Sequence, residues 1–377
     1  MTDQCRDIDH RRICSRREVI RRLVGIASFT ASFGRLSALV GQTRSGTGRL
    51  DLHHHFFAPT LLSGSSIAKR PNPRVILEYR PAQSLETMDQ VGISTAILSC
   101  PLSFGSSSSD VQMNARAFAR ETNEYGARQV SDHKGRFGLF AVLPLPDIDA
   151  TLREVEYAFD TLRADGVGLL TSYGNRWLGD KDFEPVFDEL NRRKAIVYSH
   201  PVDAPCCVNL LAETGPQTVE WNTDTSRAIW SFINDGMSAA TSGSLVAGNV
   251  ASSAPSRATR YPDIRFVWSH AGGSLLGLVS RFLGRGAAAD SLASTPQPNS
   301  RLHHLRRFYY DTAASANPVQ MQALKSLVGS SQIVFGSDFP FASAMVAVQG
   351  LQTSGFSAEE LRAVERQNAL KLLSRTA

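Results

Sequence analysis

Eight short apolar segments alternate with amphipathic segments along most of this chain. Each is rich in Val, Ile, Leu or Phe and ends near Gly, Pro, Ser or Asp. In chain order they are RLDLHHHF, STAILSCP, RFGLFAVLPLP, GVGLLTSYG, AIVYSHP, IRFVWSHAGG, RFYYDTAAS and QIVFGSDFP. Continuous apolar runs are typical of strands covered on both faces, as in parallel sheets. Eight such strands alternating with helices predict an α/β fold, specifically a (β/α)8 TIM barrel.

The segments between these strands show helical patterns. We expect helices over 84–91, 110–130, 149–165, 183–194, 218–236 and 357–374. Asp-Ile-Asp after Pro146 resembles a helix N-cap, and Ser357-Ala-Glu-Glu resembles a capping box. A Ser/Ala-rich piece at 248–258 interrupts the pattern before the sixth strand, and we expect it to be a flexible surface insertion.

Residues 1–45 form a basic leader that we exclude from the fold, which leaves 46–377 as one barrel domain. Ser15-Arg16-Arg17 followed by an apolar stretch resembles a twin-arginine export signal. Arg35 makes the apolar run too short for a transmembrane helix, so we expect no membrane span. The leader therefore predicts a periplasmic or secreted protein. The alternative is a basic disordered N-terminus on a cytoplasmic protein.

The basic charge of the chain comes from this leader. The whole chain has a formal charge of +5, with 40 Lys/Arg and 35 Asp/Glu. Residues 1–50 hold ten Lys/Arg and four Asp/Glu, so the remainder holds 30 against 31, a net charge of −1. A nearly neutral body without interleaved basic and aromatic residues argues against a nucleic-acid partner.

The cysteines do not indicate a disulfide framework, since there are five and two lie in the leader. Cys206 and Cys207 are neighbours, which is a poor geometry for a disulfide with each other. We interpret them as loop or pocket-wall residues.

Histidine and aspartate recur where the predicted strands end. These positions are His53-His54-His55 in the first strand, His200 in the fifth, His270 in the sixth and Asp338 in the eighth. Catalytic residues of (β/α)8 barrels lie at the carboxyl ends of the strands, so these side chains are expected to meet at one mouth. Because strand side chains alternate, His53 and His55 are expected to point inward and His54 outward.

Imidazoles combined with a carboxylate suit Zn²⁺, and also Mn²⁺ or Fe²⁺. We expect one divalent ion, Zn²⁺ first and Mn²⁺ as the alternative, held by His53, His55, His200 and Asp338. An open coordination position would remain for water or substrate. His270 would then be free to act as an acid, a base or a hydrogen-bond donor. Asp311, which ends the seventh strand, is expected either to orient a histidine or to cap a turn.

The strings DLHHHF, YSHP, SHAGG, YYDTAA and GSDFPF resemble the amidohydrolase-related (amidohydrolase 2) family, essentially from Leu50 to the C-terminus. The resemblance is greatest to its decarboxylase branch, which includes 6-methylsalicylate and aminocarboxymuconate-semialdehyde decarboxylases. It implies the metal ligands named above, catalytic roles for His270 and Asp338, and a homodimer. Arg281 matches an arginine of the family that is expected to meet a substrate carboxylate or a neighbouring subunit. Ser84 stands where the semialdehyde decarboxylases have arginine, which argues against their substrate.

Such a site supports two reaction classes. One is non-oxidative decarboxylation of a small salicylate-like carboxylic acid, with Asp338 or His270 supplying the proton. The other is metal-dependent hydrolysis of a lactone, ester or amide, in which the same groups accept a proton from water. Phe57, Tyr173 and Trp177 lie at or just beyond strand ends, and we expect them either to bind an aromatic substrate or to pack within the barrel. A catalytically silent metal-binding module is disfavoured because all four predicted ligands are present.

Overall fold

The computed structural model describes residues 48–59, 73–102, 115–207, 210, 214–234, 255–284 and 292–374. All of them belong to one unit, Ser45–Ala377. The predicted leader at 1–45 lies outside the described residues. Among the helices that the structure describes, none combines the length and apolar character needed to cross a membrane.

Eight parallel strands form the centre of the fold, in the order β1-β2-β3-β4-β7-β8-β9-β10. They are β1 (Arg49–His55), β2 (Ile93–Ser99), β3 (Phe137–Val142), β4 (Gly166–Leu170), β7 (Ile196–His200), β8 (Arg265–Trp268), β9 (Tyr309–Asp311) and β10 (Ile333–Val334). The chain after β10 returns to β1, where Leu52 N donates to Phe335 O at 3.0 Å and Asp338 N donates to His53 O at 2.9 Å. The predicted TIM barrel is therefore confirmed, and each apolar segment contributes one strand.

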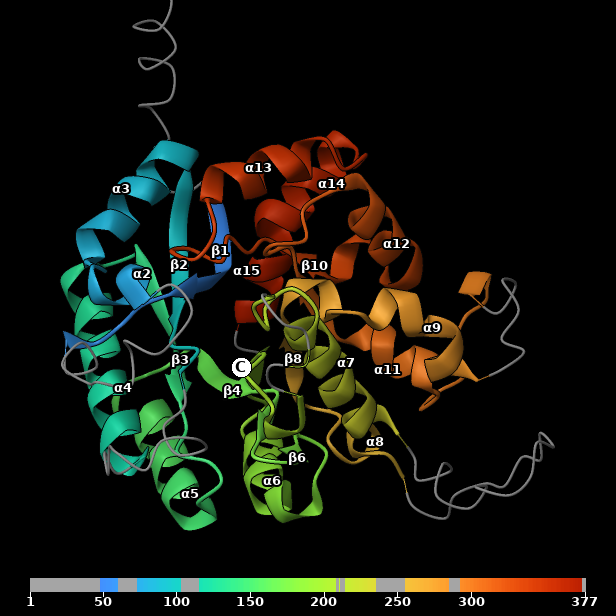
Figure 1. Ribbon diagram of the computed structural model, residues 1–377, viewed down its shortest axis with the longest axis horizontal. Helices are drawn as coiled ribbons and strands as arrows, with labels where there is room; N and C mark the ends of the chain where they lie inside the picture. Colours follow the sequence, from blue (N-terminus) through green and yellow to red (C-terminus); the bar gives the residue numbers. More distant parts are fainter. Residues whose placement is uncertain are drawn as a thin grey trace, which may run out of the picture. The chain divides into compact units, whose positions relative to one another are not determined.

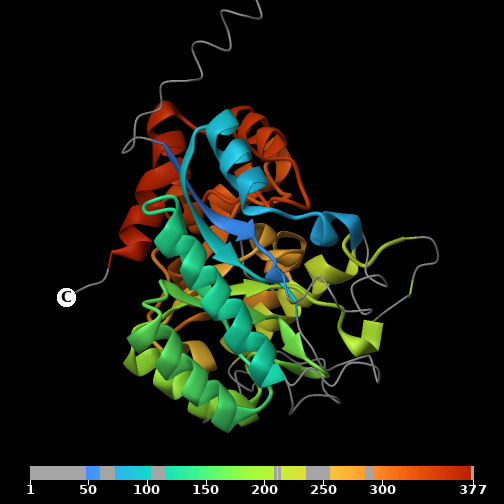
Figure 2. The ribbon, with the colours of Figure 1, turned by 90° about the vertical axis from the view of Figure 1, so that its left-hand side faces the viewer.

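Helices follow the strands and surround them (Figure 1). They are α2 (Pro73–Leu77), α3 (Pro81–Val91), α4 (Ala115–Asp132), α5 (Ile148–Glu156), α6 (Glu184–Arg192), α7 (Glu220–Ile233), α8 (Arg257–Arg260), α9 (Leu275–Leu283), α11 (Arg301–Arg307), α12 (Pro318–Val328), α13 (Ala344–Gln352), α14 (Ala358–Arg362) and α15 (Asn368–Leu373). Figure 2 shows α4 lying along the outside of the barrel, where it packs against β3. A small antiparallel hairpin, β5 (Ser172–Tyr173) with β6 (Arg176–Trp177), follows β4.

Apolar side chains fill the end of the barrel where the strands begin. Buried residues of the strands form this layer together with two residues of α15: Leu50, Leu52, Ile97, Phe140, Ile196, Tyr198, Val267, Val334, Ala369 and Leu372. Burying each such side chain contributes roughly 1.5–3 kcal/mol to folding. Because this end of the barrel is filled by apolar residues, the polar side chains of a site lie at the opposite end, where the strands end, as is usual in the fold.

Most helix predictions agree with the structure, and the end signals act as expected. The Asp147 side chain accepts from Ala150 N at 3.0 Å, and Ser357 and Glu360 form the predicted capping box. The helix predicted over 149–165 ends earlier, since α5 passes into a π-helical turn at Tyr157–Thr161.

Two other expectations need correction. Residues 248–254 of the predicted flexible insertion lie outside the described part of the chain, but its end is ordered, because Ser256 caps α8 and Ala258 is fully buried. The structure also joins Cys206 and Cys207 by a disulfide, despite their adjacency.

Candidate metal and catalytic site

The end of β1 supplies two inward-facing imidazoles. His53 and His55 lie on the same face of the strand, and their Nε2 atoms face each other at 3.0 Å. His54 points away from them, as the alternation of strand side chains predicted. Its Nδ1 lies 3.0 Å from Asp51 Oδ2, and its Nε2 lies 3.0 Å from Ser84 Oγ. His54 is thus a buried structural residue of the barrel wall.

Asp338 reaches the same point from the turn after β10. Its backbone has a positive φ of 61°, an unusual conformation for a non-glycine residue. The turn is fixed from β1, because the buried carboxylate of Asp51 accepts from Ser337 N at 3.0 Å and from Ser337 Oγ at 2.6 Å. Asp338 Oδ1 consequently lies 3.2 Å from the Nε2 atoms of both His53 and His55.

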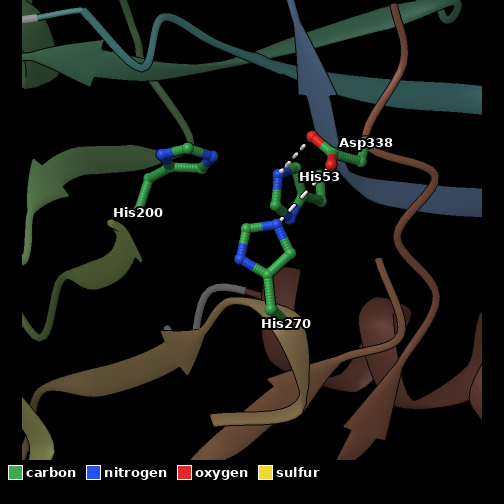
Figure 3. A group of neighbouring side chains, drawn as sticks. All are labelled: His53, His200, His270 and Asp338. Atoms are coloured by element: carbon green, nitrogen blue, oxygen red, sulfur yellow. Dashed lines mark ion pairs between the residues drawn. The ribbon is translucent and has the colours of Figure 1, made fainter. Parts of the chain in front are cut away.

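His200 and His270 complete the group from the other side (Figure 3). His200 ends β7, and its Nδ1 lies 2.8 Å from Pro201 O, which leaves Nε2 free to face the centre. His270 follows β8 with a positive φ of 53°, and its Nε2 lies 3.6 Å from Asp338 Oδ2. One ligand atom from each of His53, His200, His270 and Asp338 lies within 4.8 Å of the others.

Asp311 supports the group from β9. Its Oδ2 lies 2.8 Å from His53 Nδ1, and its Oδ1 accepts from His270 N at 2.9 Å and from Ala313 N at 3.0 Å. Asp311 was expected either to orient a histidine or to cap a turn, and it does both. It orients His53, and it accepts from the backbone of the turn after β8. A partner of this kind fixes the ring so that Nε2 points into the site.

These residues fit a divalent cation. Two ligands bound at about 2.0–2.1 Å to one ion lie about 3.0–3.4 Å apart. The His53–His55 and His–Asp338 separations of 3.0 and 3.2 Å fall in this range. His270, expected to stand beside the ligands, lies within the compact four-residue group, while His55 lies directly against it. The donor set thus offers four imidazoles and one carboxylate.

Electrostatics in the group also favour a cation. Burial alone would lower the pKa of His53, but the carboxylates of Asp311 and Asp338 outweigh it and raise the pKa to about 10. Burial lowers the pKa of His55 to about 4, and burial with neighbouring histidines holds the pKa of His200 well below its usual range. Burial would raise the pKa of Asp338, yet His53 and the other histidines hold it well below normal. His55 and His200 are therefore neutral imidazoles beside an ionised Asp338, which are the protonation states that ligate metals, and His53 would release its proton when a cation binds.

The predicted substrate residues are distributed unevenly. Tyr173 is buried, its Oη accepts from Leu170 N at 3.0 Å, and it lines a pocket beside His200. Phe57 is buried and packs against Tyr79 and Phe341. Trp177 is half-buried, and its Nε1 donates to Asp224 Oδ1 at 2.6 Å. Arg281 is exposed in the last turn of α9.

Several residues that line a second pocket beside His200 were not predicted from the sequence. The described lining of this pocket includes Leu102, Asp203, Trp221 and Phe341. Phe341 is the last residue of the GSDFPF string, so its position just beyond Asp338 could have indicated it. Trp221 opens α7, far from any predicted strand end, and no local pattern marks it.

Comparison with known proteins agrees with this architecture. The model of the amidohydrolase family known as amidohydrolase 2 matches residues 50–375. Decarboxylase yanB of Aspergillus niger is 32% identical over 346 residues, covering 87% of this chain and 88% of that protein. The 6-methylsalicylic acid decarboxylase of Penicillium expansum is 32% identical over 340 residues, covering 87% of this chain and 96% of that protein.

Solved structures share the fold at lower identity. A 2,6-dihydroxybenzoate decarboxylase in complex with 2,6-dihydroxybenzoate has a TM-score of 0.67 and 20% identity, covering 87% of this chain and 99% of its own. A dihydroxybenzoic acid decarboxylase from Polaromonas sp. JS666, with bound manganese and 2-nitroresorcinol, has a TM-score of 0.69 and 20% identity. The match covers 87% of this chain and 97% of that one. Because the family model spans nearly the whole barrel, this chain belongs to the amidohydrolase 2 family.

Proposed function

We propose that this protein is a metal-dependent, non-oxidative decarboxylase of a salicylate-like aromatic acid. One observation carries the proposal. A match that covers 87% of this chain and 96% of a 6-methylsalicylic acid decarboxylase coincides with a convergent cluster of His53, His200, His270 and Asp338 at the barrel mouth. The relatives named for decarboxylation of dihydroxybenzoates share the same fold, which supports an aromatic substrate.

In this proposal His53, His55, His200 and Asp338 hold the ion. A divalent ion here would act as a Lewis acid toward the phenolic and carboxylate oxygens of the substrate. Three imidazoles and a carboxylate suit Zn²⁺, and Mn²⁺ is the alternative because the Polaromonas relative contains manganese. Elemental analysis of the purified protein, followed by reconstitution of chelated protein with each ion, separates the two metals.

His270 and Asp338 perform the proton transfer. One of them delivers a proton to the ring carbon that bears the carboxylate, and the bond from that carbon to the carboxyl group then breaks. Its electron pair returns to the ring, so aromaticity is restored and CO2 leaves. For 6-methylsalicylate the products are 3-methylphenol and CO2. His270 Nε2 and Asp338 Oδ2 lie 3.6 Å apart, so a small approach of the two groups would allow a proton to pass between them for the next cycle.

The second candidate is hydrolysis of a lactone, ester or amide. It is favoured by the same pair, because His270 and Asp338 stand together and either can accept a proton from an attacking water. The two candidates differ in their product, since only decarboxylation releases CO2.

The test is turnover of 6-methylsalicylate by protein beginning near Gly46 and loaded with Zn²⁺ or Mn²⁺. We expect 3-methylphenol and CO2 in equal amounts, and loss of both with Asp338→Asn and after chelation. Protein that binds metal but forms no 3-methylphenol contradicts the 6-methylsalicylate assignment. A panel of aryl esters and lactones then tests the hydrolase.

Three further parts of the proposal concern binding and location. Phe57, Tyr173, Trp177 and Arg281 would serve substrate binding, with Arg281 placed on α9 to meet a carboxylate or the second subunit of a homodimer. Residues 1–45 would act as a twin-arginine signal for export, ahead of a 46–377 barrel domain. Light scattering measures the oligomeric state, and N-terminal sequencing of protein from cell fractions shows whether and where the leader is cleaved.

A further inference from the structure

The pocket beside His200 differs in character from the cluster that it borders. Its described lining is mostly apolar and includes Ile76, Leu102, Val202, Asp203, Trp221 and Phe341. Among these described lining residues there is neither Lys nor Arg, and Asp203 is the one carboxylate. Among the described residues, a substrate held at the cluster would therefore meet an apolar surface with a single negative charge.

Trp221 is fixed in place at this cavity. It lies in the first turn of α7, and its Nε1 donates to Asp203 Oδ1 at 2.6 Å. The indole meets the His200 ring edge to face, with ring centroids 6.0 Å apart and an interplanar angle of 69°. Asp203 follows β7 by three residues, so the same loop carries the predicted ligand His200 and the group that orients the indole.

A second aromatic ring borders the cavity. Phe341 lies three residues beyond Asp338, and its ring centroid is 5.5 Å from that of His55. Each ring thus contacts one of the histidines predicted to bind metal. Aromatic side chains stabilise a flat ligand ring by offset-stacked or edge-to-face contact.

We propose that Trp221 and Asp203 determine which aromatic acids the site accepts, an inference that rests on the proposed decarboxylase function. Trp221 provides an apolar surface for the substrate ring. Asp203 holds the indole and repels any second anionic group on that ring, because like charges in a partly desolvated site are costly. The accepted class is then a salicylate with one carboxylate and apolar ring substituents.

The test compares two acids on metal-loaded protein. They are 6-methylsalicylate and 4-hydroxyisophthalate, which is salicylate with a second carboxylate. Calorimetry measures binding, and CO2 release measures kcat and KM. Asp203→Asn removes the charge but keeps an acceptor for Trp221, whereas Trp221→Leu removes the aromatic surface. Two substitutions serve as matched controls: Asp149→Asn at an exposed position of α5, and Trp230→Phe elsewhere on α7.

We expect the wild type to prefer 6-methylsalicylate and Asp203→Asn to reduce that preference about tenfold. Trp221→Leu should raise KM for 6-methylsalicylate about tenfold with less than a threefold change in kcat. An unchanged preference in Asp203→Asn overturns the inference, as does a Trp221→Leu variant with unaltered KM. Binding without CO2 release from either acid contradicts the proposed function instead, and the affinity ratios still decide the roles of Asp203 and Trp221.

Discussion

Asp311 shows how much of the site depends on a residue outside the predicted ligand set. One of its oxygens contacts His53 Nδ1 and the other accepts from the backbone of His270, so a single buried carboxylate aligns two members of the cluster. Neighbours of this kind set both the tautomer and the basicity of a metal-binding histidine. Asp51 does similar work for the turn that carries Asp338.

We therefore expect Asp311→Asn to weaken metal binding about 10- to 100-fold, because an amide cannot keep both contacts of the carboxylate. Competition with a chelator of known affinity measures the effect, and circular dichroism checks that the barrel is folded. Asp263→Asn, at an exposed position, is the control. Equal metal affinity in Asp311→Asn and the wild type would show that Asp311 does not support the site.

Some residue assignments could be made from the sequence and others could not. The inward direction of His53 and His55 followed from strand alternation, which is a local rule. The partner of Trp177 did not follow, because Asp224 lies 47 residues further along and reaches it only when α7 packs beside the β5–β6 hairpin. The contact of His54 with Ser84 depends in the same way on how α3 covers β1.

At the scale of elements, the turn after β8 is the most constrained connection at the site. Gly273 has a φ of 65°, and a Cβ there would lie 2.1 Å from the backbone oxygen of Asn222. That oxygen also accepts from Ser274 N at 3.0 Å, so α7 holds the turn closely. Glycine is required because neither the backbone angle nor the space admits a side chain.

Gly273→Ala is accordingly expected to destabilise the protein by about 2 kcal/mol or more and to displace His270. Gly277→Ala is the matched control, since Gly277 lies in α9 and a Cβ there meets nothing within 4 Å. The control should be stabilised by about 0.5–1 kcal/mol. Urea unfolding of both variants makes the measurement, and a neutral Gly273→Ala would contradict this account of the turn.

The stability of the protein is expected to depend on pH through His304, which joins two helices. His304 is buried on α11, and its Nε2 lies 2.9 Å from Thr259 Oγ1 of α8. Burial lowers its pKa from 6.5 to about 4. Because the folded-state pKa is the lower one, the unfolded chain takes up the proton first as the pH falls. The contribution of neutral His304 to the free energy of unfolding is therefore complete above pH 6.5 and is lost progressively as the pH falls toward 4.

His304→Gln should therefore lose less stability than the wild type between pH 7 and pH 5, by about 2 kcal/mol. Denaturant unfolding at both pH values gives the difference, and it isolates this residue because all other histidines are common to the two proteins. His303→Gln, the less buried neighbour, serves as control. A wild-type pH dependence retained in His304→Gln would exclude this role.

Strands were predictable as elements, but their ends were less so. The last apolar segment suggested a strand up to Asp338, whereas β10 comprises only Ile333–Val334. The chain beyond β10 turns toward β1, where Asp51 accepts a hydrogen bond from Ser337 N, a residue 286 positions away in the sequence. Hydrophobic pattern indicates which residues are buried, and such distant hydrogen bonds decide where regular pairing stops.

For the whole molecule, the order of the strands was enough to bring the site together. Parallel strands in a closed barrel present all their carboxyl ends at one mouth, so His53, His200, His270 and Asp338 meet although they span most of the domain. The cavities were not predictable, because Trp221, Phe341 and Leu102 come from connections whose course depends on the assembled barrel.

The central claim is that this site protonates a ring carbon as CO2 leaves. Turnover of 6-methylsalicylate in D2O tests it directly, with nuclear magnetic resonance and mass spectrometry of the product. We predict 3-methylphenol with one deuterium, at the carbon between the hydroxyl and methyl groups. Unlabelled 3-methylphenol incubated with the protein in D2O controls for later exchange. A product without deuterium at that carbon, or no 3-methylphenol from protein that holds its metal, would contradict the account.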